Sequence, residues 1–198
     1  MNRLKVGKTH GFTLTEILVA LGIGMVVLAA VTTTFISQTK IYNAQEQINE
    51  MEQNARGAID VITRELKMAG YKPNGGTFDG VTYSASQLMI QADLDSSGTI
   101  STSSSTNEQI TYAYDSASKQ VTRKLGTGTA EVLADNITGF TFSYLNSSGA
   151  TTTTSSSIRQ VAISITAITA KPDLNYSANN GYRIYQITAT ITPPNLGL

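Results

Sequence analysis

Four oxygen-bearing side chains in the middle of the sequence have a spacing that suits a hard cation. They are Asp93, Asp95, Ser97 and Glu108. Acids at the first and third positions of the loop and Gly98 at the sixth match the first half of a calcium loop. The acid expected at the twelfth position is absent, so Glu108, from the next strand, is the candidate to replace it. A calcium site and a plain glycine-containing hairpin turn both explain these residues, and the sequence leaves both open.

A single carboxylate, Glu16, lies near the start of a long apolar run and needs a chemical explanation. The run covers residues 12–36, about 25 residues, which is enough for a helix to cross a bilayer. A charge within such a segment is costly, so it usually has a partner or a function. Ahead of the run, Arg3, Lys5 and Lys8 supply positive charge with no acid among them. This pattern orients the leader toward the cytoplasm and the rest of the chain outward.

Three interpretations of this N-terminal segment compete. An ordinary signal peptide also has a basic start and an apolar stretch, here with a cut near Ala29 or Ala30. This run is longer than a typical signal core, however, and it contains a carboxylate. A plain membrane anchor fits the length but leaves Glu16 unexplained. The third interpretation accounts for both features, because residues 8–16, Lys-Thr-His-Gly-Phe-Thr-Leu-Thr-Glu, closely resemble the type IV prepilin signal.

This resemblance implies processing and assembly chemistry at three residues. A prepilin peptidase would cut between Gly11 and Phe12, and Phe12 would then be N-methylated. The resemblance also implies that Glu16 pairs with the Phe12 ammonium of a neighbouring subunit. Such a pair would neutralise the carboxylate in its apolar surroundings and set the axial register of a filament.

Residue types that would support catalysis or nucleic-acid binding are scarce. The chain has no cysteine, and its one histidine, His10, lies in the leader. A histidine-based triad and a histidine zinc site are therefore excluded from the mature chain, so we predict no catalytic residue, no required cofactor and no enzyme.

Without the three basic residues of the leader, the 14 basic side chains fall to 11 against 14 acidic ones, a net charge of about −3. This mildly acidic body gives no support for nucleic acid as a partner, for which Arg123 and Lys124 are too few.

The elements that position these residues begin with one long helix. Beyond the apolar run, apolar and small side chains recur every three or four residues from Ile41 to Ala69, an amphipathic stripe at helical spacing. Gly70 is a natural stop, and Pro73 prevents the helix from resuming. Residues 31–34 form a β-branched cluster of low helix propensity, so the helix there either loosens or is held by packing.

After Pro73 the sequence reads as strands between turns, with two Ser/Thr-rich tracts, Ser96–Thr106 and Ser147–Ser157, as exposed loops. Alternation in the later strands, such as Val161 and Ile163 on one face and Ala162 on the other, indicates one buried and one wet face of an antiparallel sheet. The long helix is the obvious cover for the buried face. The predicted strands are Val81–Ser84, Gln87–Gln91, Gln109–Tyr114, Lys119–Lys124, Thr138–Leu145, Ile158–Ala167 and Tyr182–Thr192.

Beyond the leader, four segments resemble PilW-type minor pilins and, more distantly, the J-type pseudopilins of type II secretion. They are residues 64–71, 108–115, 158–167 and 182–196. The resemblance implies a pilin-like α+β fold, with a long N-terminal helix packed against an antiparallel β-sheet domain. It divides the chain into a leader (1–11), a transmembrane or filament-core helix (12–37), its amphipathic continuation (38–70) and a β-rich domain (71–198).

The function that follows is that of a minor pilin, a structural subunit of a type IV pilus or related filament. Its partners would be a prepilin peptidase, other pilin subunits in a filament or tip complex, and the inner membrane that holds the precursor before assembly at the cell surface. A pseudopilin of type II secretion, and a ligand-binding minor pilin for adhesion or DNA uptake, remain as alternatives.

Overall fold

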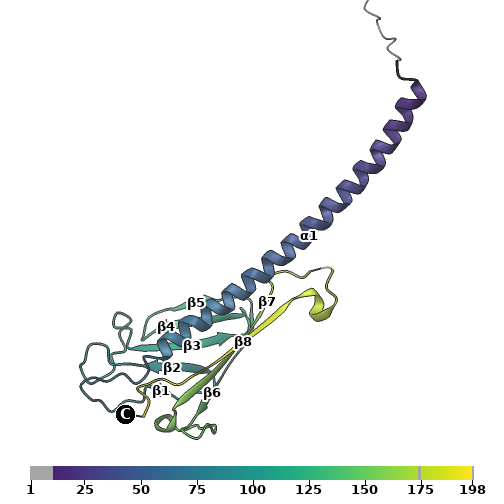
Figure 1. Cartoon of the computed structure of the whole chain (residues 1–198). Coiled ribbons are helices and arrows are strands. Elements are labelled where there is room, and N and C mark those ends of the chain that lie inside the picture. Colours follow the sequence, from purple (N-terminus) through teal and green to yellow (C-terminus); the bar gives the residue numbers. More distant parts are fainter. Residues whose placement is uncertain (1–10, 174, 198) are drawn as a thin grey trace, which may run out of the picture. The chain divides into compact units, whose positions relative to one another are not determined.

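The computed structural model describes residues 11–173 and 175–197, which form two compact units that meet at Gln45 and Glu46. The basic residues and His10 of the expected leader lie outside the described residues. Helix α1 (Leu14–Leu66) is followed by eight strands and two short 3-10 helices, Ser155–Ser157 and Ala178–Gly181 (Figure 1).

The first unit consists of the N-terminal part of α1, whose apolar side chains are exposed. The β-branched cluster at residues 31–34 is fully helical. Its three threonine hydroxyls each donate to the carbonyl four residues earlier, Thr32 to Leu28, Thr33 to Ala29 and Thr34 to Ala30, at 2.8–2.9 Å. These bonds satisfy polar groups that would otherwise face apolar surroundings. The cluster therefore forms helix without a protein partner for its hydroxyls.

In the second unit, the rest of α1 buries a stripe at helical spacing, as the sequence predicts. The buried side chains are Met51, Ala55, Ala58, Ile59, Ile62 and Leu66. The α-helix ends at Leu66 rather than at the predicted Ala69, because the next turn tightens to bonds between residues three apart. Gly70 follows with a φ of +78°, and its N–H donates to the carbonyl of Gln91 at 2.9 Å.

The first sheet has five antiparallel strands in chain order, each paired with the next. They are β1 (Val81–Thr82), β2 (Gln87–Gln91), β3 (Gln109–Asp115), β4 (Gln120–Leu125) and β5 (Ala130–Ala134). Gly80 precedes β1 at a close approach of two backbones, since a Cβ at this position would lie 2.2 Å from the nitrogen of Gly70. This contact ties the end of α1 to the start of the first sheet.

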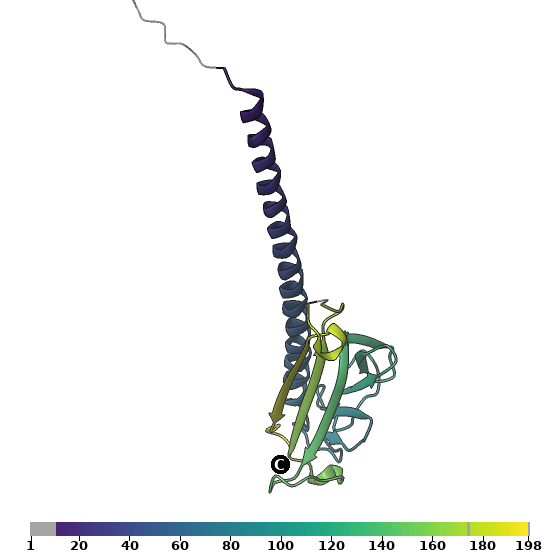
Figure 2. The ribbon, with the colours of Figure 1, turned by 90° about the vertical axis from the view of Figure 1, so that its right-hand side faces the viewer.

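The second sheet has three antiparallel strands, β6 (Ile137–Leu145), β7 (Gln160–Ile168) and β8 (Ile184–Ile191), which lie side by side in Figure 2. Inward residues of both sheets, such as Tyr112 and Ile163, form one hydrophobic core with the buried stripe of α1. The helix therefore covers apolar faces of two sheets, not one as predicted.

All seven predicted strands are present, each within two residues of its predicted bounds. The prediction missed β5, whose five residues contain only one β-branched side chain, Val132, and are mostly exposed. The expectation of a single sheet was also wrong. Asn136, with a φ of +53°, separates β5 from β6, and β6 pairs with β7 instead of continuing the first sheet. The predicted α+β architecture, a long N-terminal helix packed against antiparallel β-structure, is confirmed.

Candidate functional site

The start of α1 places Glu16 in a reciprocal cap with Thr13. Both the backbone N–H and the hydroxyl of Thr13 donate to Oε2 of Glu16, at 2.9 Å each, and the N–H of Glu16 points back to the threonine oxygen at 3.3 Å. This is the capping box that a threonine followed three residues later by a glutamate can form. Among the described residues Oε1 of Glu16 receives no hydrogen bond. The carboxylate therefore caps its own helix with one oxygen and keeps the other available.

This cap was not predicted, although the pattern Thr-Leu-Thr-Glu at residues 13–16 signals it directly. Gly11 and Phe12, the residues of the expected cut, lie immediately before the cap and outside regular structure. The Phe12 side chain is 85% exposed, and no atom lies within 4 Å of the Cβ position of Gly11. A peptidase would meet no packed side chain at this bond.

The apolar part of α1 exposes its side chains in the described part of the first unit. One stretch of this helix has a mean hydropathy of 2.4 over 18 residues, carries at most two charged groups and buries none of its residues. Leu14, Leu18, Val26 and Phe35 are each more than half exposed. A helix that is apolar on all sides requires lipid or other helices around it. By length and composition, the helix can cross a membrane.

The loop after β2 brings together the four side chains predicted to hold a cation. Asp93, Asp95 and Glu108 each offer a carboxylate oxygen, and these oxygens lie within 4.8 Å of one another. Ser97 joins them, since its N–H donates to Oδ1 of both aspartates at 3.0 Å. Its hydroxyl donates to the carbonyl of Thr99 at 3.0 Å. Several oxygens of the kind that Ca²⁺ prefers therefore converge around Gly98.

The buried members of this cluster already have backbone partners. Asp93 and Glu108 are fully buried. Besides the Ser97 bond, Asp93 accepts the N–H of Gly98 at 2.8 Å. Glu108 accepts three, from Leu94, Asp95 and Ser101, at 2.8–3.1 Å. Hydrogen bonds from the hydroxyl and N–H of Ser97 hold the pKa of the exposed Asp95 carboxyl below its usual value. The geometry thus suits either an amide-anchored turn or a calcium loop, and calcium binding stays a prediction.

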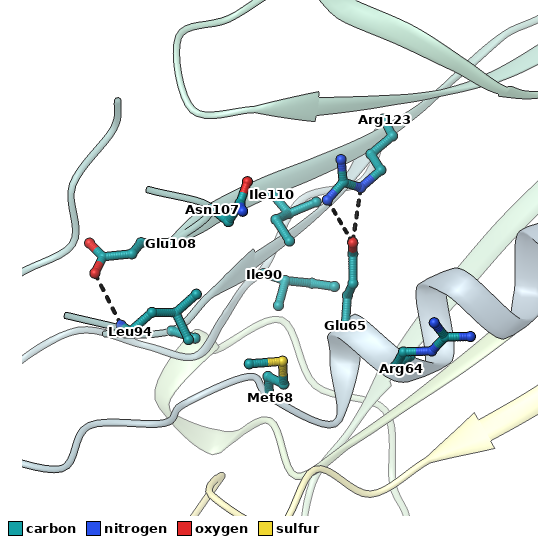
Figure 3. Close-up of a pocket in the computed structure, with 10 residues that line it drawn as sticks. Arg64, Glu65, Met68, Ile90, Leu94, Asn107, Glu108, Ile110 and Arg123 are labelled. Atoms are coloured by element: carbon teal, nitrogen blue, oxygen red, sulfur yellow. Dashed lines mark hydrogen bonds and ion pairs between the residues drawn. The ribbon is translucent and has the colours of Figure 1, made fainter. Parts of the chain in front are cut away.

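A pocket of about 300 Å³ lies between the last turn of α1 and strands β2, β3 and β4 (Figure 3). Its walls are mainly apolar, and Met68 and Leu94 are partly exposed, 46% and 38%. The lining residues are Arg64, Glu65, Met68, Ile90, Ala92, Leu94, Asn107, Glu108, Ile110 and Arg123. Glu108 links this pocket to the acidic loop, because it accepts the N–H of Leu94.

An ion pair fixes one wall of the pocket. Arg123 donates to Oε1 of Glu65 through Nε at 3.0 Å and through Nη2 at 2.6 Å, and the hydroxyl of Tyr112 also donates to Glu65. Burial, together with the hydrogen bond to Glu65, raises the pKa of Tyr112, and the bond to Glu65 raises the pKa of Arg123. These charges serve the fold, since they join α1 to the first sheet.

From the sequence, Arg123 was a candidate only as a cation for nucleic acid, and its pairing with Glu65 was not predicted. A signal for its real position was present, because Arg123 stands two residues after Val121 and so shares the inward face of β4. Glu65 lies one residue before the buried Leu66, at the edge of the apolar stripe. Its partner could not be identified, because 58 residues separate the two.

Comparison with known proteins identifies two separate matches in the sequence. Residues 44–184 match the family described as prepilin peptidase-dependent protein B, and residues 7–32 match the prokaryotic N-terminal methylation motif. Among solved structures, a type IV-like pilin from Thermus thermophilus is similar, with a TM-score of 0.45 and 13% sequence identity. The alignment covers 70% of this chain and 94% of that one. A comparison with curated proteins found no match.

Proposed function

This chain belongs to the prepilin peptidase-dependent protein B family, and from that premise we propose that it is a PilW-type minor pilin, a structural subunit of a type IV pilus or a related filament. The family is pilin-like and structural, so the protein is not an enzyme. The observation that carries the proposal is the coincidence of the methylation motif at residues 7–32 with the exposed, predominantly apolar part of α1, which begins just inside that motif.

The proposed life of the subunit has two stages. A precursor waits in the inner membrane with the apolar part of α1 in lipid, and a prepilin peptidase removes the leader after Gly11. Methylation of Phe12 follows, and the helix then moves from lipid into the core of a filament. Exposed side chains such as Leu14, Val26 and Phe35 support this sequence of events, because each needs apolar surroundings in both stages.

Glu16 is proposed to pair with the Phe12 ammonium of a neighbouring subunit. The capping box supports this role, because it uses Oε2 and keeps Oε1 available for a second partner. It also offers a competing explanation, in which Glu16 only caps its own helix. The two roles make different demands on the side chain. A cap needs an acceptor, which glutamine supplies, whereas pairing with an ammonium needs the negative charge.

The first experiment is the intact mass of the full chain extracted from membranes. We expect loss of residues 1–11 and addition of one methyl group. A native chain that still begins at Met1, or that is cut near Ala30 and is freely soluble, would overturn the proposed function.

The second experiment separates the two roles of Glu16. Glu16→Gln keeps the cap and loses the charge, and Thr13→Val loses the capping hydroxyl and keeps the charge. If Glu16 pairs across subunits, Glu16→Gln is processed normally yet enters filaments poorly, and Thr13→Val enters them nearly as well as the unmodified chain. Normal incorporation of Glu16→Gln into filaments would contradict pairing across subunits and would show that Glu16 acts only as a cap of its own helix.

A pseudopilin of type II secretion is the main alternative, because the same leader and helix serve both systems. Deletion of the protein distinguishes them, since loss of surface pili with intact secretion supports the pilus and the reverse supports the secretion system. A ligand-binding role in adhesion or DNA uptake would instead leave pili in normal number but remove attachment or uptake.

Calcium binding by Asp93, Asp95, Ser97 and Glu108 is a separate proposal about the β-rich domain. The convergence of three carboxylates within 4.8 Å supports it. We expect calcium to raise the melting temperature of the full chain and Asp95→Asn to abolish that increase. Asp115→Asn is the matched control, because Asp115 is also an exposed aspartate, at the end of β3, that accepts a backbone N–H two residues on, at 2.9 Å. Identical melting with calcium and with a chelator would dismiss the site.

A further inference from the structure

A groove of about 310 Å³ lies between an edge of the first sheet, at β1, and an edge of the second sheet, at β6. Small-molecule sites occupy about 300–1,000 Å³, so the groove falls at the lower end of their range. Three segments line it: residues 83–85, which follow β1, residues 142–144 of β6, and residues 151–153 of the second Ser/Thr-rich tract. The groove therefore belongs to the β-rich domain alone.

Aromatic rings form part of the wall of this groove. The ring centroids of Tyr83 and Tyr144 lie 5.4 Å apart, and those of Tyr144 and Phe142 lie 5.7 Å apart, each pair at an angle of 63°. Rings at such an angle meet edge to face, so they do not cover one another's faces as stacked rings would. The side chain of Tyr83 is also exposed. The groove thus offers aromatic surface to a ligand.

Hydroxyl groups supply much of the remaining lining. The side-chain hydroxyls of Tyr83, Ser143, Thr151 and Thr153 line the groove and make no hydrogen bond within the part of the chain that the structure describes. A hydroxyl can both donate and accept a hydrogen bond. Among the described residues, none of those that line the groove carries a charge. These features match an uncharged ligand whose own polar groups both donate and accept.

The exposed Ser/Thr-rich tract at residues 147–157 is fixed in place where it meets the groove. The N–H of Thr152 donates to the carbonyl of Tyr144, on β6, at 2.9 Å. The N–H of Tyr83 donates to Oγ of Ser155, in the short 3-10 helix of the tract, at 3.0 Å. These bonds join the three lining segments to one another. The groove is therefore formed before a ligand arrives, which lowers the entropic cost of binding.

We propose that this groove binds a neutral saccharide unit. A sugar ring has C–H groups on its faces and hydroxyls around its rim, so its faces can pack on the aromatic wall while its hydroxyls bond to those of the lining. An acidic sugar would place a charge in the groove without a counter-charge, and burial of an unpaired charge is costly. The site would add a surface ligand to the structural role proposed above and does not depend on that role.

An extended peptide is the competing occupant, and the structure disfavours it. A peptide that adds to a sheet edge needs a row of free backbone groups. Beside the groove, the carbonyl of Tyr144 on the edge strand β6 already accepts the N–H of Thr152. Ligand recognition here thus falls to side-chain hydroxyls and rings, which suit a sugar.

Glycan binding by the full chain tests the proposal directly. The fluorescently labelled chain, in a detergent without a sugar headgroup, is applied to an array of neutral and acidic oligosaccharides and to an array of uncharged peptides. We expect binding to a subset of the neutral oligosaccharides. Absence of such binding, binding confined to acidic oligosaccharides, or binding to peptides alone would refute the proposal.

Two pairs of variants then place the bound sugar, with the neutral oligosaccharide that binds best as the probe. Tyr83→Ala removes the exposed ring, and Tyr71→Ala is the matched control, because Tyr71 is also exposed but lies outside the lining. We expect Tyr83→Ala to lower the affinity at least about tenfold and Tyr71→Ala to leave it within about twofold.

The second pair keeps the shape of the side chain and removes a hydroxyl. Thr153→Val should lower the affinity about threefold to tenfold, and Thr141→Val, at an exposed position of β6 outside the lining, should have no effect. Unchanged melting temperatures would show that the losses do not arise from unfolding. Undiminished binding by both Tyr83→Ala and Thr153→Val would place the sugar elsewhere and contradict the proposal.

Discussion

Glu65 joins α1 to the first sheet, and its removal should destabilise the protein far more than removal of a similar acid on the same helix. Glu65→Gln keeps the shape of the side chain but leaves Arg123 without its counter-charge. The two side chains are only 18% and 23% exposed, so water can compensate little of the loss. Breaking a fully buried ion pair costs about 3–5 kcal/mol, and exposed pairs contribute about 0.2–1 kcal/mol. We expect about 2–3 kcal/mol for this partly buried pair.

Glu52→Gln provides the matched control. Glu52 pairs with Arg56 at 3.5 Å on the surface of α1, where the side chains are 38% and 57% exposed. Its removal should cost no more than about 0.5 kcal/mol. At about 2–4 °C per kcal/mol for a chain of this size, Glu65→Gln should lower the melting temperature by about 4–12 °C and Glu52→Gln by at most about 2 °C.

The assay is thermal unfolding of the full chain in detergent, followed by the circular dichroism of its tyrosines. The double variant Glu65→Met/Arg123→Met should be more stable than the sum of the two single changes predicts, because it removes both charges together. Equal shifts for Glu65→Gln and Glu52→Gln would refute the reasoning, since burial would then have no bearing on the strength of the pair.

Two further predictions concern the backbone and the tyrosines. Gly80→Ala should destabilise the chain by about 3 kcal/mol in denaturant melts, because its Cβ would lie 2.2 Å from the nitrogen of Gly70. Gly57→Ala, in the middle of α1 with no atom within 4 Å of its Cβ, should instead stabilise by about 0.5–1 kcal/mol. Unchanged or increased stability of Gly80→Ala would contradict the contact between the end of α1 and the first sheet. In an absorbance titration of the nine tyrosines, Tyr112 and Tyr144 should stay protonated at pH 11, because burial raises the pKa of Tyr112 and raises that of Tyr144 to about 12. The folded pKa of each of these two tyrosines lies above the unfolded value of about 10, so keeping the buried hydroxyl protonated favours the folded chain. This contribution to folding stability is complete below pH 10 and is lost as the pH rises through the folded pKa. Ionisation of all nine tyrosines in the folded chain at pH 11 would show that these two hydroxyls reach water.

Local patterns in the sequence were sufficient for most of the fold. The alternation of Val161, Ile163 and Ile165 predicts β7 because side chains on a strand point to opposite faces in turn. The stripe on α1 and the glycine after it predict the helix and its end to within three residues. Strand β5 could not be found this way, because its mostly exposed residues lack a regular alternation of apolar and polar side chains, although it pairs with β4, which ends only five residues earlier.

The candidate sites show the same division between local and distant information. The loop from Asp93 to Gly98 was recognisable from spacing alone, and Glu108 could be chosen because the next strand begins after it. The cap between Thr13 and Glu16 was also predictable, because a threonine followed three residues later by a glutamate is the pattern of a capping box. By contrast, the pairing of Glu65 with Arg123 and the division into two sheets depend on contacts between residues far apart in the chain. The spacing of residues in a single sequence does not reveal such contacts.

Both residues of the cap on α1 lie downstream of Gly11, and this position separates maturation from folding. A cut after Gly11 would leave every bond between Thr13 and Glu16 in place, so the first turn of the helix would not unwind when the leader departs. The new amino terminus, at Phe12, would then lie next to a first helical turn that is already formed. Each matured subunit could therefore present its cationic end to the growing polymer without first having to refold.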